Sequence, residues 1–322
     1  MEKVVLLADR NSDSWDFAEK IQNYIEGRYL DKLSLKEVSI KFFRNNEIDI
    51  EVPENMRGKD VYFIHDSNKN PQDWWVELLL LKDLLPSASA ESISFVLPNM
   101  LYSRKDWKDR PHVPISARAL AESISPGLKR IITMDLHSAS TQGFYPARVP
   151  LDNLSSFPTV SDYIQERPLD FGELERLVIV TPDVGGTKRA AKFAKKSNSE
   201  YPIAIIDKRR DPQTGNIKEM YLLGDVNDKD CLIVDDMIDS GGTLCDASNL
   251  LKKNGGKKIY CYSTHGMFTE GTEKVCNKFE KVMTSNTHYI HHNSVEVIDM
   301  SSIFAEAIYR AQKGLSISEL FK

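Results

Sequence analysis

The sequence predicts an α/β protein of two domains, each organised around a mostly parallel sheet with helices on both faces. The first observation is the length of 322 residues, which corresponds to two domains of about 150 residues each. The second is the alternation of short apolar runs with amphipathic helical stretches, an order typical of parallel sheets. The third is the order strand, acidic turn, glycine pair and helix, which occurs twice in the second half of the chain.

In the first half of the chain the apolar pattern changes period several times. Phe17, Ile21 and Ile25 recur at helical spacing, whereas residues 4–7 are continuously apolar. Pro111 and Pro114 keep the charged segment before them out of a helix. We therefore expect strands at 4–7, 61–64, 92–97 and 130–135, and helices at 14–25, 73–85 and 116–123.

The second half repeats this alternation. We expect strands at 177–180, 203–206, 231–234, 258–262 and 295–298, and helices at 187–195, 244–253 and 301–313. Residues 155–158 contain serine and proline and are the expected crossing between domains. This gives an N-terminal domain at 1–153 and a C-terminal domain at 154–322, with the last helix expected to pack back on the N-terminal domain.

Composition excludes several classes of partner. A net charge of −5 gives no overall attraction to nucleic acid or to an anionic membrane, so an anion site must be built locally. The first residues become polar at Asp9 and Arg10, too early for a signal peptide, and no window is long enough for a membrane span. The four cysteines lack metal-ligand spacing and are predicted to be reduced thiols. We expect a cytoplasmic protein.

Residues 231–243, CLIVDDMIDSGGT, are the strongest functional signal. A buried strand ends at Asp235 and Asp236, and Gly241 and Gly242 then allow a tight turn into a helix whose N-terminal N–H groups suit a phosphate. Carboxylates accept hydrogen bonds, so the two aspartates are suited to the vicinal hydroxyls of a sugar or to Mg²⁺. The stretch predicts a sugar-phosphate pocket. The alternative is an ordinary strand-to-helix turn capped by Asp and Ser.

Other polar segments allow two interpretations each. Residues 102–110 are either a solvated loop or a nucleotide contact, and Trp107 is suited either to stacking on a base or to shielding a hinge. The cations of residues 208–210 either close over the phosphates of a nucleotide or simply form part of a basic surface hairpin. His137 is either a satisfied strand-end histidine or a metal ligand. His288, His291 and His292 are predicted to lie in a solvated turn, and Gly186-Thr187-Lys188 does not fit a P-loop.

The chain resembles the ribose-phosphate pyrophosphokinases, the phosphoribosyl-diphosphate (PRPP) synthetases, essentially from end to end. Residues 231–243 are similar to the PRPP-binding signature of type I phosphoribosyltransferase folds. Further segments resemble family motifs in the same order: RPHVPISARALAES, IITMDLHSASTQGF, VTPDVGG, IAIIDKRR, and THGMF with AEAIYR. The resemblance implies two duplicated phosphoribosyltransferase-like domains and a homo-oligomer, from dimer to hexamer, whose active site is shared between protomers.

The resemblance also implies an activity and a role for each matching residue. The expected reaction transfers the β,γ-diphosphoryl group of Mg·ATP to the 1-hydroxyl of ribose 5-phosphate, with Mg²⁺ as cofactor. Ribose 5-phosphate would contact Asp235, Asp236, Asp239, Ser240, Gly241, Gly242 and Thr243. ATP would contact Phe43, Asn45, Glu47, Arg104, Lys105 and Asp109. The metal would be held by His137 and Asp183, and the catalytic cations would be Lys208 and Arg210.

Two departures from the family pattern and two rival functions qualify this expectation. Lys105 stands where the family usually has Gln, and Trp107 replaces a commonly basic position, and both departures bear on the choice of nucleotide donor. One rival is a noncatalytic homologue acting as a regulatory subunit or scaffold, which predicts loss of catalytic residues that are all present here. The other is a phosphoribosyltransferase that consumes PRPP, which would not require a duplicated domain.

Overall fold

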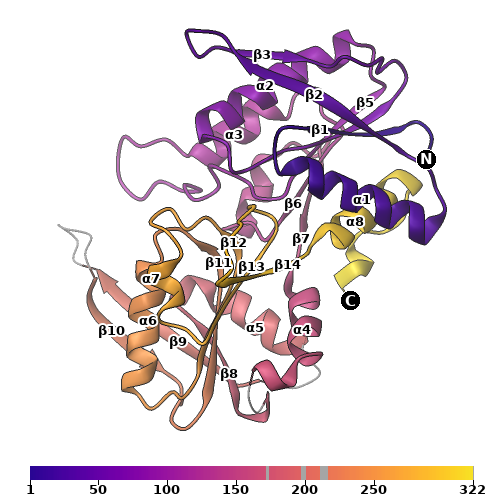
Figure 1. The fold of residues 1–322 in the computed structure, drawn as a ribbon. Helices are drawn as coiled ribbons and strands as arrows, with labels where there is room; N and C mark the ends of the chain where they lie inside the picture. The colour runs from indigo at the N-terminus through magenta and orange to yellow at the C-terminus, as the bar shows by residue number, and fades with distance from the viewer. Residues whose placement is uncertain (172–173, 197–200, 211–216, 322) are drawn as a thin grey trace. The chain divides into compact units, whose positions relative to one another are not determined.

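The computed structural model describes residues 1–171, 174–196, 201–210 and 217–321 (Figure 1). The chain divides into two compact units. Unit 1 contains Met1–Ser155, Thr287–Tyr289 and Asp299–Lys322, and unit 2 contains Ser156–Asn286 and Ile290–Ile298. The C-terminal segment therefore belongs to the same unit as the N-terminus.

Unit 1 contains a seven-stranded sheet with the order β3-β2-β1-β4-β5-β6-β7. All neighbouring strands are parallel except the pair β2 and β3, which form an antiparallel hairpin. The elements of unit 1 are β1 (Val4–Asp9), α1 (Ser14–Tyr29), β2 (Ser34–Phe42), β3 (Ile48–Glu51), β4 (Asp60–Ile64), α2 (Pro71–Ser87), β5 (Ser92–Leu97), α3 (Ser116–Ile124), β6 (Arg130–Met134), the 3₁₀ turn Ala139–Phe144, β7 (Leu151–Leu154), α8 (Ser301–Lys313) and the 3₁₀ turn Ser318–Phe321.

Unit 2 contains a second seven-stranded sheet, β10-β9-β8-β11-β12-β13-β14, in which β9 and β10 form the antiparallel hairpin. Its elements are α4 (Phe157–Gln165), β8 (Leu177–Thr181), α5 (Thr187–Lys196), β9 (Ile203–Arg210), β10 (Ile217–Leu223), β11 (Asp230–Ile238), α6 (Gly242–Lys253), β12 (Ile259–Gly266), α7 (Glu273–Cys276), β13 (Lys281–Ser285) and β14 (Val295–Ile298), with 3₁₀ turns at Pro168–Asp170, Leu174–Arg176 and Val184–Gly186. In Figure 1, α6 and α7 cover one face of this sheet, and α4 and α5 cover the other.

The two sheets have the same strand order, shifted by seven strands along the chain. Strand β4 therefore corresponds to β11, and the hairpin β2–β3 corresponds to β9–β10. This relationship confirms the predicted α/β class with two duplicated, mostly parallel sheets. It also assigns an equivalent position in the other unit to every loop that follows a strand.

Local sequence explains where the helices begin and end. Asn70 accepts a hydrogen bond from the N–H of Gln72 at 3.0 Å, and Pro71 follows as the first residue of α2. An Asn cap followed by proline is a strong helix start, because proline lacks only an N–H that has no helical partner there. Helix α1 extends one turn beyond its predicted end and stops at Leu30, which has a left-handed backbone.

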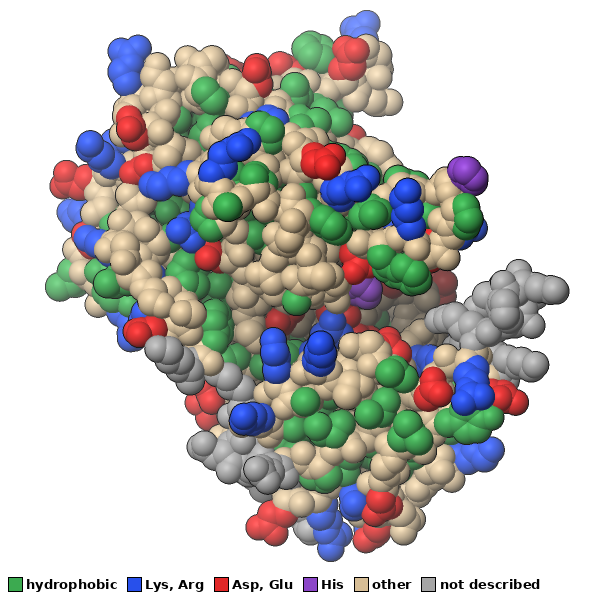
Figure 2. All heavy atoms as spheres, turned by 180° about the vertical axis from the view of Figure 1, so that it is seen from behind, with side chains coloured by type: hydrophobic (Ala, Val, Ile, Leu, Met, Phe, Trp, Pro, Cys, Tyr) green, Lys and Arg blue, Asp and Glu red, His purple; other side chains and the backbone are tan. Residues whose placement is uncertain are grey.

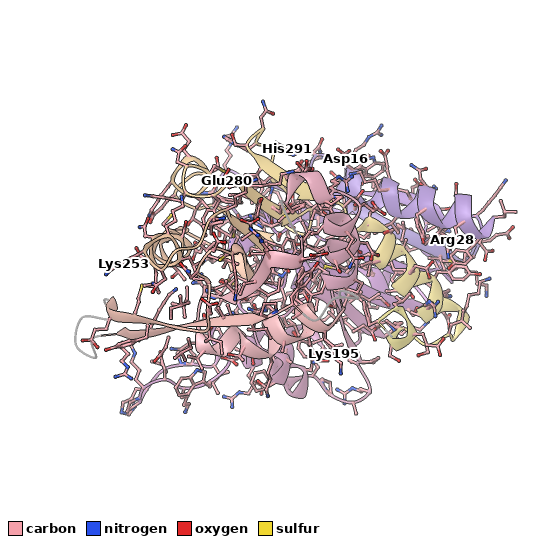
Figure 3. The ribbon with its side chains drawn as sticks, turned by 90° about the horizontal axis from the view of Figure 1, so that it is seen from below. Asp16, Arg28, Lys195, Lys253, Glu280 and His291 are labelled. Atoms are coloured by element: carbon pink, nitrogen blue, oxygen red, sulfur yellow. The ribbon has the colours of Figure 1, made fainter. Side chains whose placement is uncertain are left out.

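Helix α8 packs along α1 within unit 1, as Figure 3 shows with Asp16 and Arg28 marking the two ends of α1. The rings of Tyr29 and Tyr309 stack with centroids 3.6 Å apart. The buried carboxylate of Glu306 accepts a hydrogen bond from the Tyr29 hydroxyl at 2.5 Å and pairs with Arg28 at 3.1 Å. Buried charges need such partners, so this contact fixes the C-terminal helix on the N-terminal one.

Several elements are not among those predicted. Strand β3 is an edge strand and β2 lies between β3 and β1, and the half-exposed polar residues of both obscure the strand pattern. Helix α4 begins at Phe157, inside the segment expected to be an interdomain crossing. The prediction of a solvated turn is wrong for His288, which is half-buried, lies 2.9 Å from Ser67 Oγ, and has its pKa lowered to about 4 by burial.

The surface mixes both signs of charge. On the face drawn in Figure 2, acidic and basic side chains are interspersed with hydrophobic ones. Within the parts of the chain that the structure describes, no helix is long and apolar enough to cross a membrane.

Candidate functional site

The candidate sugar-binding acids lie at the carboxyl end of β11, a central strand of unit 2. Residues Cys231 to Val234 are completely buried, and the strand runs in parallel between β8 and β12. Asp235 and Asp236 continue the strand, with Asp235 opposite Ser263 of β12. Ligands of open parallel sheets bind beyond the carboxyl ends of the strands, so the core strand places both acids at the edge where a ligand is expected.

Arg189 joins the two acids, a contact that sequence reasoning missed. One terminal nitrogen of its guanidinium, Nη1, lies 3.1 Å from Oδ1 of Asp235 and 2.9 Å from Oδ1 of Asp236. Arg189 is on the first turn of α5, which follows β8. The cationic spacing of residues 188–195 on that helix was the available signal, but a sequence pattern cannot show that one of these cations turns towards β11.

Burial and charge act together on the acid pair. Burial and the neighbouring Asp236 raise the pKa of Asp235 well above its usual value, and Arg189 opposes this shift. Oδ1 of Asp235 also accepts the main-chain N–H of Asp236 at 2.9 Å. Burial and the adjacent carboxylate therefore favour the protonated form of Asp235, and Arg189 acts against this preference.

The glycine-containing loop between β11 and α6 has the geometry expected for an anion site. Gly241 is the residue before α6 and has a φ of 75°, in the left-handed region that favours glycine. A Cβ atom at this position would lie 2.2 Å from Cγ2 of Val275. Since α6 begins at Gly242, its first N–H groups and its positive dipole end lie at this loop.

A neighbouring segment braces the same loop. Thr269 donates a hydrogen bond from its hydroxyl to Oδ1 of Asp239 at 2.6 Å, and its main-chain N–H donates to the Asp239 carbonyl at 3.1 Å. The N–H of Met267 donates to the carbonyl of Ile238 at 2.8 Å. Ser240 and Thr243 are half-exposed within this loop. The structure thus brings Asp235, Asp236, Asp239, Ser240, Gly241, Gly242 and Thr243 together, as the sequence predicts.

Lys208 reaches the same loop from the hairpin β9–β10. Its half-buried ammonium donates a hydrogen bond to the main-chain oxygen of Thr243 at 3.4 Å. Arg210 is the last residue of β9 and pairs with Ile217 of β10; the predicted role of its side chain lies outside what the structure describes, as do residues 211–216. Lys208 is therefore the hairpin cation whose position at the loop is established.

Asp183 lies in the loop after β8 and has an exposed side chain. Its Oδ1 accepts the N–H of Gly186 at 2.8 Å, and its main-chain oxygen accepts the hydroxyl of Thr181 at 2.7 Å. A Cβ atom on Gly186 would lie 2.3 Å from Oγ1 of Thr181. The glycine is thus required for the close approach that fixes the carboxylate of Asp183.

In unit 1, Phe43, Asn45 and Glu47 occupy the tip of the hairpin β2–β3. The N–H of Phe43 donates to the carbonyl of Glu47 at 2.8 Å, and Oδ1 of Asn45 accepts the N–H of Glu47 at 3.2 Å. All three side chains are exposed, and Phe43 has a relative exposure of 54%. An exposed aromatic ring on a closed turn is available for contact with another molecule.

Arg104, Lys105 and Asp109 lie in the charged segment after β5, also in unit 1. Lys105 Nζ pairs with Oδ1 of Asp109 at 2.5 Å, and this hydrogen bond lowers the pKa of Asp109. Arg104 and Asp109 are exposed, and Trp107 has a relative exposure of 64%. The segment is therefore a surface loop with an exposed indole ring.

His137 is an exposed residue just beyond the end of β6. The backbone before it is irregular, because Asp135 has a φ of 39° although it is not glycine. The N–H of Leu136 is held by the side chain of Asn153 at 3.1 Å. Such strained turns are frequent at functional sites, and this one exposes the imidazole of His137.

The equivalent position in unit 1 differs from the candidate sugar site. A cavity of about 590 Å³ lies at the carboxyl ends of β1 and β4 and is lined by six carboxylates. Lys69 Nζ enters this acidic group, 2.9 Å from Asp9 and 3.0 Å from Glu77. The loop from β4 to α2 has no glycine, and its cation is already paired, so this position is not organised as a phosphate loop.

The predicted metal ligands are a histidine and an aspartate. Among these residues, no group of three or more His, Cys, Asp or Glu side chains is arranged to hold a metal ion. His137 and Asp183 belong to different units. Mg²⁺ commonly binds through one or two protein groups together with substrate phosphates and water, and the exposed Asp183 carboxylate suits this mode.

Comparison with known proteins gives the same family over nearly the whole chain. Residues 6–126 match the N-terminal domain of ribose phosphate pyrophosphokinase, and residues 211–322 match a phosphoribosyl synthetase-associated domain. The chain is 37% identical over 312 residues to a ribose-phosphate pyrophosphokinase of Rhizobium meliloti (strain 1021), with 94% of this chain and 96% of that protein covered. It is 37% identical over 298 residues to one from Haemophilus influenzae, covering 90% and 92% respectively.

A solved structure agrees with these relatives. The crystal structure of phosphoribosylpyrophosphate synthetase from Mycobacterium smegmatis matches with a TM-score of 0.84 and 28% sequence identity, covering 97% of this chain and 100% of that one. The strand order, the site at the carboxyl end of β11 and these matches all lead to one assignment. The chain belongs to the ribose-phosphate pyrophosphokinase family.

Proposed function

We propose that this protein is a ribose-phosphate diphosphokinase that forms PRPP and AMP from ribose 5-phosphate and Mg·ATP. The observation on which the proposal depends is the arrangement in unit 2. Paired carboxylates at Asp235 and Asp236 are continuous with a phosphate-type loop at the start of α6, and the ammonium of Lys208 contacts the end of that loop.

The sugar would occupy this arrangement in one orientation. Its 5-phosphate would accept hydrogen bonds from N–H and O–H groups of the loop from Asp239 to Thr243, where the helix dipole favours an anion. Its vicinal hydroxyls would donate to Asp235 and Asp236, which accept hydrogen bonds when ionised. This orientation leaves the 1-hydroxyl available as the nucleophile.

The reaction requires positioning and charge neutralisation more than covalent help from the protein. The 1-hydroxyl oxygen attacks the β-phosphorus of ATP, the bond between this phosphorus and the α,β-bridging oxygen breaks, AMP leaves with that oxygen, and the hydroxyl proton is released to water. Charge spreads over the nonbridging oxygens during the transfer. Lys208 and Arg210 would neutralise this charge, and preorganised cations of this kind are among the largest contributions to catalysis.

The nucleotide and the metal would use residues from several loops. Arg104, Lys105 and Asp109 would contact ATP, while Phe43, Asn45 and Glu47 of an adjacent protomer would contact its adenine. His137 and Asp183 would hold Mg²⁺, directly or through water, and the ion would neutralise the phosphate oxygens. The protein would then be a homo-oligomer with shared sites. We expect the enzyme to be cytoplasmic.

A coupled assay tests the proposal against both alternatives. Ribose 5-phosphate and Mg·ATP should yield AMP and PRPP in equal amounts. A noncatalytic homologue would yield neither product, and a phosphoribosyltransferase would instead consume PRPP with a base. Repeating the assay with several nucleoside triphosphates tests the effect of Lys105, which stands where the family usually has Gln. Failure to form PRPP with any of these donors would contradict the proposal.

A further inference from the structure

We propose that Arg189 is a positioning residue that orients the two carboxylates for the sugar hydroxyls. This inference rests on the proposed function and deepens it, because it identifies what sets the geometry of the ribose-binding acids. Arg189 would act through Asp235 and Asp236 and would make no contact with the reacting atoms.

The geometry of the contact is the first argument. A single nitrogen, Nη1, lies 3.1 Å from Oδ1 of Asp235 and 2.9 Å from Oδ1 of Asp236. All three side chains are largely buried, with relative exposures of 17% for Arg189, 14% for Asp235 and 4% for Asp236. Because the same atom holds one oxygen of each carboxylate, it fixes how both carboxyl groups are rotated. The rotation of each carboxyl group in turn sets the direction in which its Oδ2 atom points.

The charge of arginine is the second argument. Two adjacent buried carboxylates resist being ionised together, since each disfavours the charge of the other. Arginine keeps its positive charge at any physiological pH, so its presence favours the ionised form of both acids. A sugar hydroxyl needs an acceptor, and a protonated carboxyl group would present a donor at one of its oxygens. Arg189 thus favours the state that recognises a diol.

The position of Arg189 in the chain is the third argument. It lies on the first turn of α5, directly after the glycine turn that fixes Asp183. Ala190 and Phe193 are buried and anchor the helix, whereas Lys192 is exposed. In Figure 3 the label on Lys195 locates the other end of α5. The helix therefore holds Arg189 rigidly, and it offers an exposed cation as a matched control.

The test compares Arg189→Gln, Arg189→Lys and the control Lys192→Gln. For Arg189→Gln we expect KM and Kd for ribose 5-phosphate to rise about 10- to 100-fold, with kcat changed by less than about 5-fold and the Kd for ATP unchanged. Arg189→Lys keeps the charge but loses the planar fork and should be intermediate. Lys192→Gln, which removes the same charge from an exposed site, should behave as wild type.

A purely structural role gives a different result. If Arg189 only ties α5 to β11, Arg189→Gln lowers the midpoint of thermal unfolding and leaves the Kd for ribose 5-phosphate unchanged, which would overturn the inference. Should Arg189→Gln fail to fold, a Kd of wild-type value in Arg189→Lys would overturn it equally.

A double variant adds an independent measure. In an Asp236→Asn background the Arg189→Gln substitution should raise the Kd much less than it does in wild type, because the partner has lost its charge. An equal increase in both backgrounds would contradict the coupling. Calorimetric binding separates this inference from the proposed function: a wild-type protein that binds ribose 5-phosphate but forms no AMP would contradict the proposed reaction alone, whereas an unchanged Kd in the variants contradicts the role of Arg189 alone.

Discussion

The ammonium of Lys208 donates a hydrogen bond to the main-chain oxygen of Thr243 at 3.4 Å. This contact joins the hairpin β9–β10 to the loop that begins α6. The cation is therefore positioned at the proposed phosphate site. Lys208 itself lies within the paired part of the hairpin, opposite Met220. Adjacent Arg209 has a different environment, since it is exposed and lies over the ring of Tyr221 at 5.1 Å.

Replacing Lys208 should affect turnover much more than sugar binding. For Lys208→Ala we expect kcat to fall by at least about 100-fold, because a preorganised charge is lost where charge develops in the transition state. The Kd for ribose 5-phosphate should change by less than about 3-fold. Arg209→Ala is the control on the same strand and should keep near-normal turnover. Near-normal kcat in Lys208→Ala would remove this residue from the mechanism.

Gly241→Ala tests whether the loop needs its left-handed turn. The new Cβ would lie 2.2 Å from Cγ2 of Val275, and alanine is strained at a φ of 75°. We expect a loss of unfolding free energy of about 2 kcal/mol or more and a raised KM for ribose 5-phosphate. The measurements are denaturant unfolding and steady-state kinetics.

Gly271→Ala separates strain from steric conflict. Gly271 has a φ of 85°, but no atom lies within 4 Å of a Cβ placed there. Its substitution should cost only about 1 kcal/mol and leave KM unchanged. If both alanine variants lowered stability equally with no change in KM, the close packing of Gly241 would have no part in sugar binding.

Mixing two inactive variants tests the shared active site. If Phe43 serves the site of an adjacent protomer, Phe43→Ala should be impaired by itself. The two variants Phe43→Ala and Lys208→Ala are then dissociated, mixed and allowed to reassemble. For random pairing in dimers, the mixture should recover activity towards about a quarter of the wild-type value. As a further control, Phe43→Ala is mixed with wild-type protomers that have been inactivated beforehand. No recovery, with hetero-oligomers demonstrated by mass, would mean that each protomer completes its own site.

The buried Glu77 gives a prediction for stability against pH. Burial raises the pKa of Glu77 from 4.5 to about 7, with Lys69 opposing the shift. A raised carboxyl pKa means that the folded protein binds more protons than the unfolded chain between these values. Its contribution to stability is therefore fully present below about pH 4.5 and is lost as the pH rises through about 7, a change on the order of 3 kcal/mol.

His65 acts in the opposite direction and must be separated. Burial lowers its pKa to about 3, so its contribution to stability rises with pH up to its ordinary value of 6.5. His65 Nε2 lies 3.4 Å from Oε2 of Glu77, so both proteins are compared in a His65→Asn background. There we expect the difference in unfolding free energy between the Glu77 and Glu77→Gln proteins to fall from pH 4.5 to pH 7. A difference that rises over this range would show that attraction by Lys69 outweighs burial.

The sequence predicts the central strands and the phosphate-type loop because their signals are local. Cys231 to Val234 form a continuous apolar run before two acids and two glycines, and each feature has a physical meaning within a few residues. Strands β2 and β3 were missed because their polar, half-exposed residues have no comparable pattern.

Arg189 was missed for a different reason. Its contact with Asp235 and Asp236 joins residues far apart in the chain, and it depends on how α5 is rotated against β11. The ion pairs of Lys69 were missed for the same reason, because its partners Asp9 and Glu77 lie on different elements. Periodicity identifies a helix face, but tertiary packing decides which partner that face meets.

The central claim is that the turn following β11 seats a pentose phosphate. A crystal structure of the protein with ribose 5-phosphate tests it directly. The account predicts the 5-phosphate against the N–H groups of Gly241 to Thr243 and the ribose hydroxyls within hydrogen-bond distance of Asp235 and Asp236. Well-defined density for the sugar at any other position, with this loop unoccupied, would contradict it.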